Sequence, residues 1–178
     1  MSTAVVYCSQ TGYTRTYARW LAESLGTEAL PFERRDEAAA SGADTLVFLS
    51  WFHAGGFKGA KWLRGLMDAQ PGKRYVVVGV GAYPMPSEDW PQSDTDEAFE
   101  RAFPRERYSA LKHFYCQGGF DFDRLCTLDK LAMRAFFRMQ AKAAETDPRI
   151  AFALESMKQG FDGTNRAYLQ PVLDYLGA

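Results

Sequence analysis

The fold is decided by residues 5–14, which read Val5-Val6-Tyr7-Cys8-Ser9-Gln10-Thr11-Gly12-Tyr13-Thr14. The first three form a β-branched and aromatic run, which is typical of a buried parallel strand. Apolar side chains then recur at helical spacing over residues 15–25, and Gly26 ends that helix. Residues 9–14, called the 9–14 loop below, join the two and are rich in hydroxyl groups. A strand that turns directly into a helix indicates an α/β domain.

The rest of the chain repeats this alternation. Its 178 residues are the length of one domain, so we expect a single domain over residues 1–178. Strands that alternate with helices predict a parallel sheet covered on both faces. Residues 118–178 are predicted to be an extended helical C-terminal part of the same domain. The predicted strands are 5–7, 28–32, 45–49, 75–80 and 113–116, and the predicted helices are 15–25, 59–69, 93–103, 129–145, 150–158 and 164–176.

Composition excludes several classes of function. The net charge of −1 argues against a nucleic-acid-binding protein that acts through a broad basic surface. No stretch approaches the ~20 apolar residues that cross a bilayer, and the N-terminus runs into a strand without a leader, so we expect a cytoplasmic protein. Three cysteines without CxxC spacing and two distant histidines predict neither a disulfide framework nor a metal site. Cys8 is interpreted as a packing residue rather than a nucleophile.

The loops that follow the predicted strands are expected to form one site. In an open parallel sheet, ligands bind beyond the carboxyl ends of the strands. The 9–14 loop supplies hydroxyl donors from Ser9, Thr11 and Thr14, and Gly12 permits a tight turn. It opens onto a helix N-terminus, where unpaired N–H groups and the helix dipole favour an anion. We therefore predict phosphate binding; the alternative is that Thr11 or Thr14 merely caps the helix.

Neither common nucleotide motif is present in this loop. The chain has no GxxxxGK[ST] and no GxGxxG after its first strand, so an ordinary P-loop or dinucleotide fold is not indicated. Aromatic residues stand instead in the later loops, at Trp51, Phe52 and Tyr83, beside glycines. Each alone is more often a core residue. Together, next to a phosphate site, they predict that at least one contacts a flat heterocycle.

Residues 9–14 resemble the flavodoxin phosphate signature [ST]-x-T-G-x-T, and Tyr17, Ala18 and Leu21 continue the pattern of the first helix of that family. The resemblance extends through Gly119. It implies a doubly wound, flavodoxin-like, five-stranded parallel sheet of order 2-1-3-4-5, and noncovalent FMN that carries electrons one at a time. The cofactor-binding residues that it implies are Ser9, Gln10, Thr11, Gly12, Tyr13 and Thr14 at the phosphate, with Ser50, Trp51, Phe52, His53, Ala54, Gly81, Ala82, Tyr83, Gly118 and Gly119 around the ring.

Two features depart from a short flavodoxin, a class that is usually strongly acidic. The chain is nearly neutral, although residues 88–100 hold six acidic side chains and no Lys or Arg. We interpret that run as a solvated helix face rather than a docking face. The second departure is the sixty-residue C-terminal part. Its residues 118–122 and 129–134 are loosely similar to flavodoxin-type protoporphyrinogen oxidases.

The C-terminal part is also basic. Residues 101–142 carry nine Lys or Arg against four acidic residues, a net charge of +5. A membrane-surface or acidic-substrate face is one reading of this segment. We favour an amphipathic core helix with snorkelling basic residues, because Phe136, Phe137 and Met139 are few and scattered.

Three functions follow from these observations. The first is an FMN-binding electron-transfer protein that works with redox partner proteins or with a small-molecule electron donor or acceptor. The second is a flavin-dependent oxidoreductase, of protoporphyrinogen-oxidase or quinone-linked type, that acts on its own small substrate. The third is an interaction module without a cofactor, which nothing in the 9–14 loop favours. We predict the first, in which the flavin does the chemistry and the chain needs no catalytic acid or base.

Overall fold

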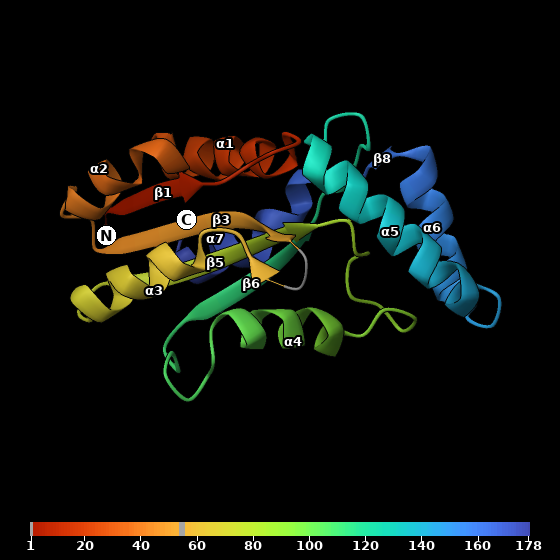
Figure 1. Ribbon diagram of the computed structural model, residues 1–178. Coiled ribbons are helices and arrows are strands. Elements are labelled where there is room, and N and C mark those ends of the chain that lie inside the picture. The colour runs from red at the N-terminus through yellow and green to blue at the C-terminus, as the bar shows by residue number, and fades with distance from the viewer. Residues whose placement is uncertain (1, 54–55) are drawn as a thin grey trace.

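A parallel β-sheet forms the centre of the computed structural model, which describes residues 2–53 and 56–178 (Figure 1). The strands lie in the order β2-β1-β3-β5-β6, and all four pairings along this path are parallel. This order confirms the predicted doubly wound sheet. The five strands are β1 (Thr3–Tyr7), β2 (Ala29–Pro31), β3 (Thr45–His53), β5 (Arg74–Gly81) and β6 (Lys112–Gln117).

Helices cover both faces of this sheet, because successive side chains of a strand point to opposite faces. Val5 packs with helix α1 (Tyr13–Leu25) and helix α7 (Gln170–Leu176) on one face. Its neighbour Val6 packs on the other face with α2 (Arg35–Ala40), α3 (Ala60–Ala69) and α4 (Gln92–Ala102). The interiors of the central strands β1, β3 and β5 are buried, which explains their continuous apolar sequence.

Several short elements differ from the sequence-based expectation. β3 extends to His53 instead of ending at residue 49, because Trp51 pairs with Val80 and the strand then pairs antiparallel with β4 (Gly56–Phe57). Trp51 and Phe52 therefore belong to a strand rather than to a loop. The 3-10 helix η1 (Phe32–Arg34), helix α2 and the antiparallel pair of β7 (Gly119–Phe120) with β8 (Phe161–Asp162) were not predicted, and the predicted helix 164–176 consists of the 3-10 helix η2 (Arg166–Leu169) followed by α7. Elements of two to six residues carry too little periodicity to be recognised.

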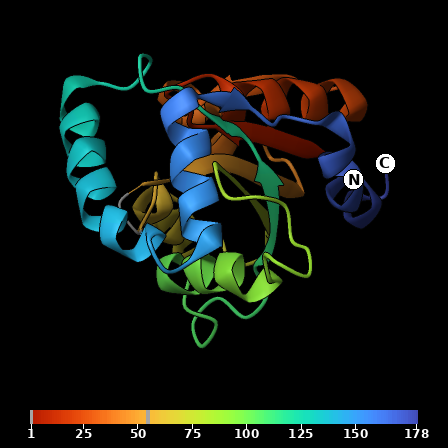
Figure 2. The same cartoon turned by 90° about the vertical axis from the view of Figure 1, so that its right-hand side faces the viewer.

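Helices α5 (Thr127–Ala144) and α6 (Pro148–Gln159) pack against each other beyond the carboxyl edge of the sheet (Figures 1 and 2). We call them the α5–α6 layer. The turn between them is closed by Asp147, which accepts a hydrogen bond from the Arg149 N–H, and Pro148 begins α6. α5 buries none of its 18 residues, so the expectation of a core helix was wrong. The layer lies across the edge of the sheet, where there is no strand face to bury against.

No helix within residues 2–53 and 56–178 is both long enough and apolar enough to cross a membrane.

Candidate functional site

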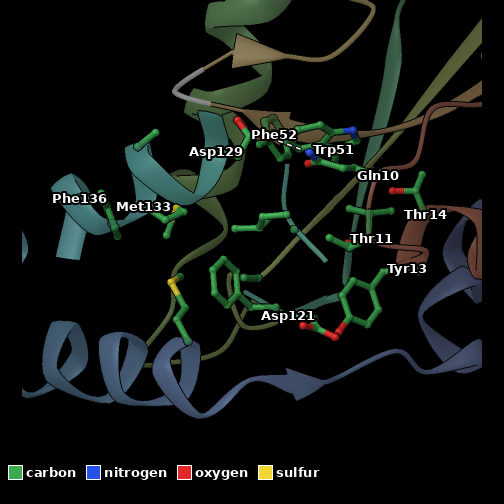
Figure 3. A pocket seen from close by; sticks show the side chains of 18 residues that line it. Gln10, Thr11, Tyr13, Thr14, Trp51, Phe52, Asp121, Asp129, Met133 and Phe136 are labelled. Carbon is green, nitrogen blue, oxygen red and sulfur yellow. Dashed lines mark hydrogen bonds between the residues drawn. The ribbon is translucent and has the colours of Figure 1, made fainter. Parts of the chain in front are cut away.

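A cavity of about 520 Å³ lies between the carboxyl edge of the sheet and the α5–α6 layer (Figure 3). Its walls come from the 9–14 loop, from the ends of β3 and β5, from β7 and from both helices of the layer. This is the edge at which doubly wound folds bind ligands. The lining residues are Gln10, Thr11, Tyr13, Thr14, Trp51, Phe52, Val80, Gly81, Ala82, Gly119, Phe120, Asp121, Leu125, Asp129, Ala132, Met133, Phe136 and Met157.

The 9–14 loop turns tightly into α1. Gly12 is the N-cap residue, with φ of 106°, a left-handed conformation that glycine adopts without strain. Its N–H donates a hydrogen bond to Ser9 Oγ at 3.2 Å. Because Gly12 occupies the N-cap position of α1, neither Thr11 nor Thr14 is the N-cap residue. No side chain caps this helix, which argues against the simple capping interpretation. Thr11 and Thr14 both line the cavity instead.

Two contacts join the 9–14 loop to distant sequence. Gln10 Nε2 donates to Asp129 Oδ2 of α5 at 2.7 Å, the pair joined by a dashed line in Figure 3. Arg124 Nη1 donates to the carbonyl oxygen of Thr11 at 3.1 Å. The start of α5 is therefore tied directly to the loop that we predict to bind phosphate.

Trp51 and Phe52, at the end of β3, supply aromatic surface to the cavity. The Phe52 ring packs edge-on against Phe57 and Phe99, with centroids 5.2 and 5.1 Å apart. A Cβ atom at Gly79 would lie 2.6 Å from the Phe52 ring, so glycine at this position of β5 lets Phe52 sit at the cavity wall. Phe52 therefore packs against the core and also lines the cavity.

Tyr83 does not line the cavity. Its hydroxyl donates to Asp94 Oδ2, and its ring packs edge-on against Trp90 with centroids 5.0 Å apart. Burial and the bond to Asp94 raise the pKa of Tyr83 to about 12. The side chain is therefore engaged on the α4 side of the loop that follows β5.

The other predicted residues fall in three groups. Gly81, Ala82 and Gly119 line the cavity, as do Gln10 and Tyr13. Ser9, Ser50 and Gly118 do not line it: Ser9 borders a separate hollow on the β2 side of the loop, Ser50 is fully buried and its Oγ donates to the Lys58 carbonyl at 2.7 Å, and the Gly118 N–H donates to the Gly81 carbonyl at 2.7 Å. His53 contributes its backbone to β3, and Ala54 lies outside the described residues.

Sequence reasoning missed the wall that the C-terminal part contributes. Asp121, Leu125, Asp129, Ala132, Met133, Phe136 and Met157 all line the cavity. Met133 and Phe136 are spaced as one helix face, which was the available signal, but that face was assigned to the core. Phe137 packs on Phe120 with centroids 6.2 Å apart, and Met139 is exposed.

Two side chains at the 9–14 loop, Tyr13 and Cys8, have raised pKa values that suit structural roles. Burial, followed by the nearby Asp162 and Asp121, raises the pKa of Tyr13, whose hydroxyl donates to the Phe161 carbonyl at 3.2 Å. Burial also raises the pKa of Cys8, so its thiol stays protonated near neutral pH, as a packing residue would. Within the described ranges, no group of three His, Cys, Asp or Glu side chains is placed to hold a metal ion.

Comparisons with known proteins agree with this architecture. The family described as "Flavodoxin domain" matches residues 4–147. No curated protein matches the chain. Solved structures resemble it more distantly: the Trp repressor binding protein from Bacillus subtilis has 15% identity over 65% of this chain and 84% of its own, with a TM-score of 0.44. A short-chain flavodoxin associated with a non-canonical PDU bacterial microcompartment has 23% identity over 66% and 82%, with a TM-score of 0.39.

A third neighbour is larger. The rubredoxin oxygen:oxidoreductase from Desulfovibrio gigas has 15% identity and a TM-score of 0.41, and 65% of this chain corresponds to 29% of that one. These likenesses say nothing about the substrate or partner of this chain. The family match covers most of the sequence, including the 9–14 loop and every strand of the central sheet. The chain belongs to the flavodoxin family, a family of flavin-type redox proteins.

Proposed function

We propose that the protein binds one FMN noncovalently in the cavity and takes part in electron transfer. The observation that carries this proposal is a juxtaposition within one cavity: a hydroxyl-bearing loop at a helix N-terminus and aromatic side chains in the wall. Thr11 and Thr14 of the loop and Trp51 and Phe52 of β3 line the same space. A terminal phosphate and a flat heterocycle are the two parts of FMN that such a site would receive.

The residues present fit each part of that cofactor. The first N–H groups of α1 have no intrahelical partners, and together with the helix dipole they favour a phosphate. The loop adds hydroxyls and contains no lysine, so the donors that its own side chains offer the phosphate are neutral. Gly81 and Gly119 bring backbone polar groups to the wall, where they would reach the polar edge of the ring.

FMN, when bound, would supply the electron-accepting and electron-donating chemistry of the site. This chain's own residues would hold the phosphate, orient the ring and exclude water. Met133, Phe136 and Met157 of the α5–α6 layer close the side of the cavity opposite the sheet, which lowers the local polarity around the ring. For this role we propose redox partner proteins or a small electron donor or acceptor, and a cytoplasmic location.

One observation favours a second function, an oxidoreductase that acts on its own small substrate. An electron carrier needs an accessible ring edge, whereas here the α5–α6 layer lines the side of the cavity opposite the sheet with apolar side chains. A mainly apolar cavity wall suits a planar organic substrate beside the ring, of the porphyrinogen or quinone type. Turnover of such a substrate without partner proteins would establish this function over the carrier.

The test of FMN binding is a fluorescence titration of the purified protein with FMN, riboflavin and FAD. Riboflavin lacks the phosphate, so it should bind far more weakly than FMN, and FAD should also bind more weakly because its phosphate is not terminal. Equal affinity for riboflavin and FMN would contradict the phosphate assignment. A protein that quenches none of the three would contradict the function as a whole.

A further inference from the structure

Two guanidinium groups converge on the 9–14 loop at Gly12. A Cβ atom built at this glycine would lie 3.8 Å from Arg124 Nη1 and 3.8 Å from Arg15 Nη2. Arg15 belongs to the first turn of α1, whereas Arg124 comes from the segment between β7 and α5. The fold therefore brings two positive charges to a loop that contains none in its own sequence.

Arg124 is held beside the 9–14 loop by two contacts of its own, and both arginines border an open hollow. Arg124 Nε pairs with Asp121 Oδ2 at 3.0 Å, and its Nη1 bonds the Thr11 carbonyl. Both arginines line a second hollow of about 660 Å³ on the β2 side of the loop, in which Glu33 is the acidic residue. Two guanidinium groups thus share this region with the carboxylates of Glu33 and Asp121. A dianion at Gly12 would bring charge-assisted hydrogen bonds from both arginines to one ligand.

Arg124 also connects the loop to the α5–α6 layer. It precedes α5 by three residues, and the Gln10–Asp129 hydrogen bond holds the first turn of the same helix against the loop. A phosphate bound at Gly12 and contacted by Arg124 would therefore hold the beginning of α5 in the position that closes the cavity. Conversely, a displaced α5 would remove one of the two charges from the loop.

We propose that Arg124 and Arg15 are phosphate-positioning residues, and that Arg124 links occupation of the 9–14 loop to closure of the α5–α6 layer. This inference rests on the proposed binding of FMN and deepens it, since it assigns the charge that the loop itself lacks. The Arg124 side chain is 63% exposed, so its effect should be moderate and sensitive to salt.

The test measures dissociation constants for FMN and riboflavin at low and high salt. The variants are Arg124→Gln and Arg15→Gln, with Arg138→Gln as the matched control. Arg138 is an exposed residue of α5 nine positions beyond Asp129, which places it ~13 Å further along the helix. We expect Arg124→Gln and Arg15→Gln each to weaken the affinity for FMN roughly tenfold at low salt and to leave the affinity for riboflavin unchanged. Each variant should also reduce the salt dependence of FMN binding. Arg138→Gln should behave as the wild type, and Arg124→Lys should keep part of the preference for FMN.

The outcomes separate the inference from the proposed function. Equal losses for FMN and riboflavin in Arg124→Gln would show that Arg124 acts only through the local fold, and unchanged FMN affinity in both variants would also overturn the inference. In either case a wild type that prefers FMN keeps the proposed function. A wild type without any preference for FMN over riboflavin would instead remove the proposed function itself.

Discussion

The parallel sheet and the α5–α6 layer face each other across one cavity, but they are built differently. Strands β1, β3 and β5 have fully buried interiors, packed on both faces by helices. α5 buries no residue, and α6 buries only Leu154. The apolar side chains of α5 that a core would normally cover, Met133 and Phe136, line the cavity instead. The sheet is therefore packed on both faces by the protein itself, whereas the layer has few buried contacts of its own.

From this difference in burial we expect the α5–α6 layer to open more easily than the sheet. Regions with few buried apolar contacts open at lower free energy than the core does. A ligand bound in the cavity would add contacts to Met133 and Phe136 and would stabilise the observed position of the layer by mass action.

The sharpest test of the comparison is a matched pair of phenylalanine truncations. Phe48 of β3 is fully buried among Phe32, Phe57 and Trp62, so Phe48→Ala should lower the free energy of unfolding by ~3–5 kcal/mol. Phe136→Ala in α5 should cost about 1 kcal/mol without ligand, because its ring faces the cavity. Urea unfolding followed by circular dichroism measures both. Similar losses would show that the layer is as well packed as the sheet.

Hydroxyl removal from the 9–14 loop tests the sheet side of the cavity. The Thr11→Val, Thr14→Val double variant should weaken FMN by ~1–3 kcal/mol for each charge-assisted hydrogen bond that it removes, and riboflavin much less. Thr16→Val is the control, because its hydroxyl donates within α1 to the Gly12 carbonyl at 3.3 Å. Unchanged FMN affinity in the double variant would mean that these hydroxyls do not bind the phosphate.

A smaller effect, the quenching of tryptophan fluorescence by FMN, tests the aromatic wall of the cavity. Trp51 lines the cavity and Tyr83 does not, so FMN should quench Trp51 fluorescence, and release of the flavin should restore it. Trp20, Trp62 and Trp90 contribute background, so the wild type must be compared with Trp51→Phe. Identical quenching in the two proteins would remove Trp51 from the ring site.

The sequence was informative where the signal is local. The strand, turn and helix of residues 5–25 are contiguous, and the buried strands show continuous apolar runs, so the parallel sheet and the 9–14 loop could both be predicted, while the strand order followed from the resemblance to flavodoxins. Tyr83 illustrates the limit: an aromatic residue in a glycine-containing loop looks like a ring contact, yet Asp94 and Trp90 hold it elsewhere. Nothing in the spacing of these residues distinguishes the two outcomes.

The cavity wall that the C-terminal part contributes could not be predicted from the sequence, for a physical reason. Arg124 and Asp129 meet the 9–14 loop across 113 and 119 residues of sequence, so no periodicity links them. The apolar face of α5 could be read, but whether it covers a core or a cavity depends on where the helix docks. That position is fixed by single hydrogen bonds such as Gln10–Asp129, which leave no pattern in the sequence.

Hydrogen exchange with and without FMN tests most directly the central claim that the flavin occupies the cavity between the sheet and the α5–α6 layer. The account predicts that FMN slows amide exchange in residues 9–14 and throughout α5, while the outer helix α3 exchanges as before. Gln10→Ala, which removes the bond to Asp129, should reduce the protection of α5 more than that of the loop. Binding of FMN that protects neither the 9–14 loop nor α5 would contradict the account.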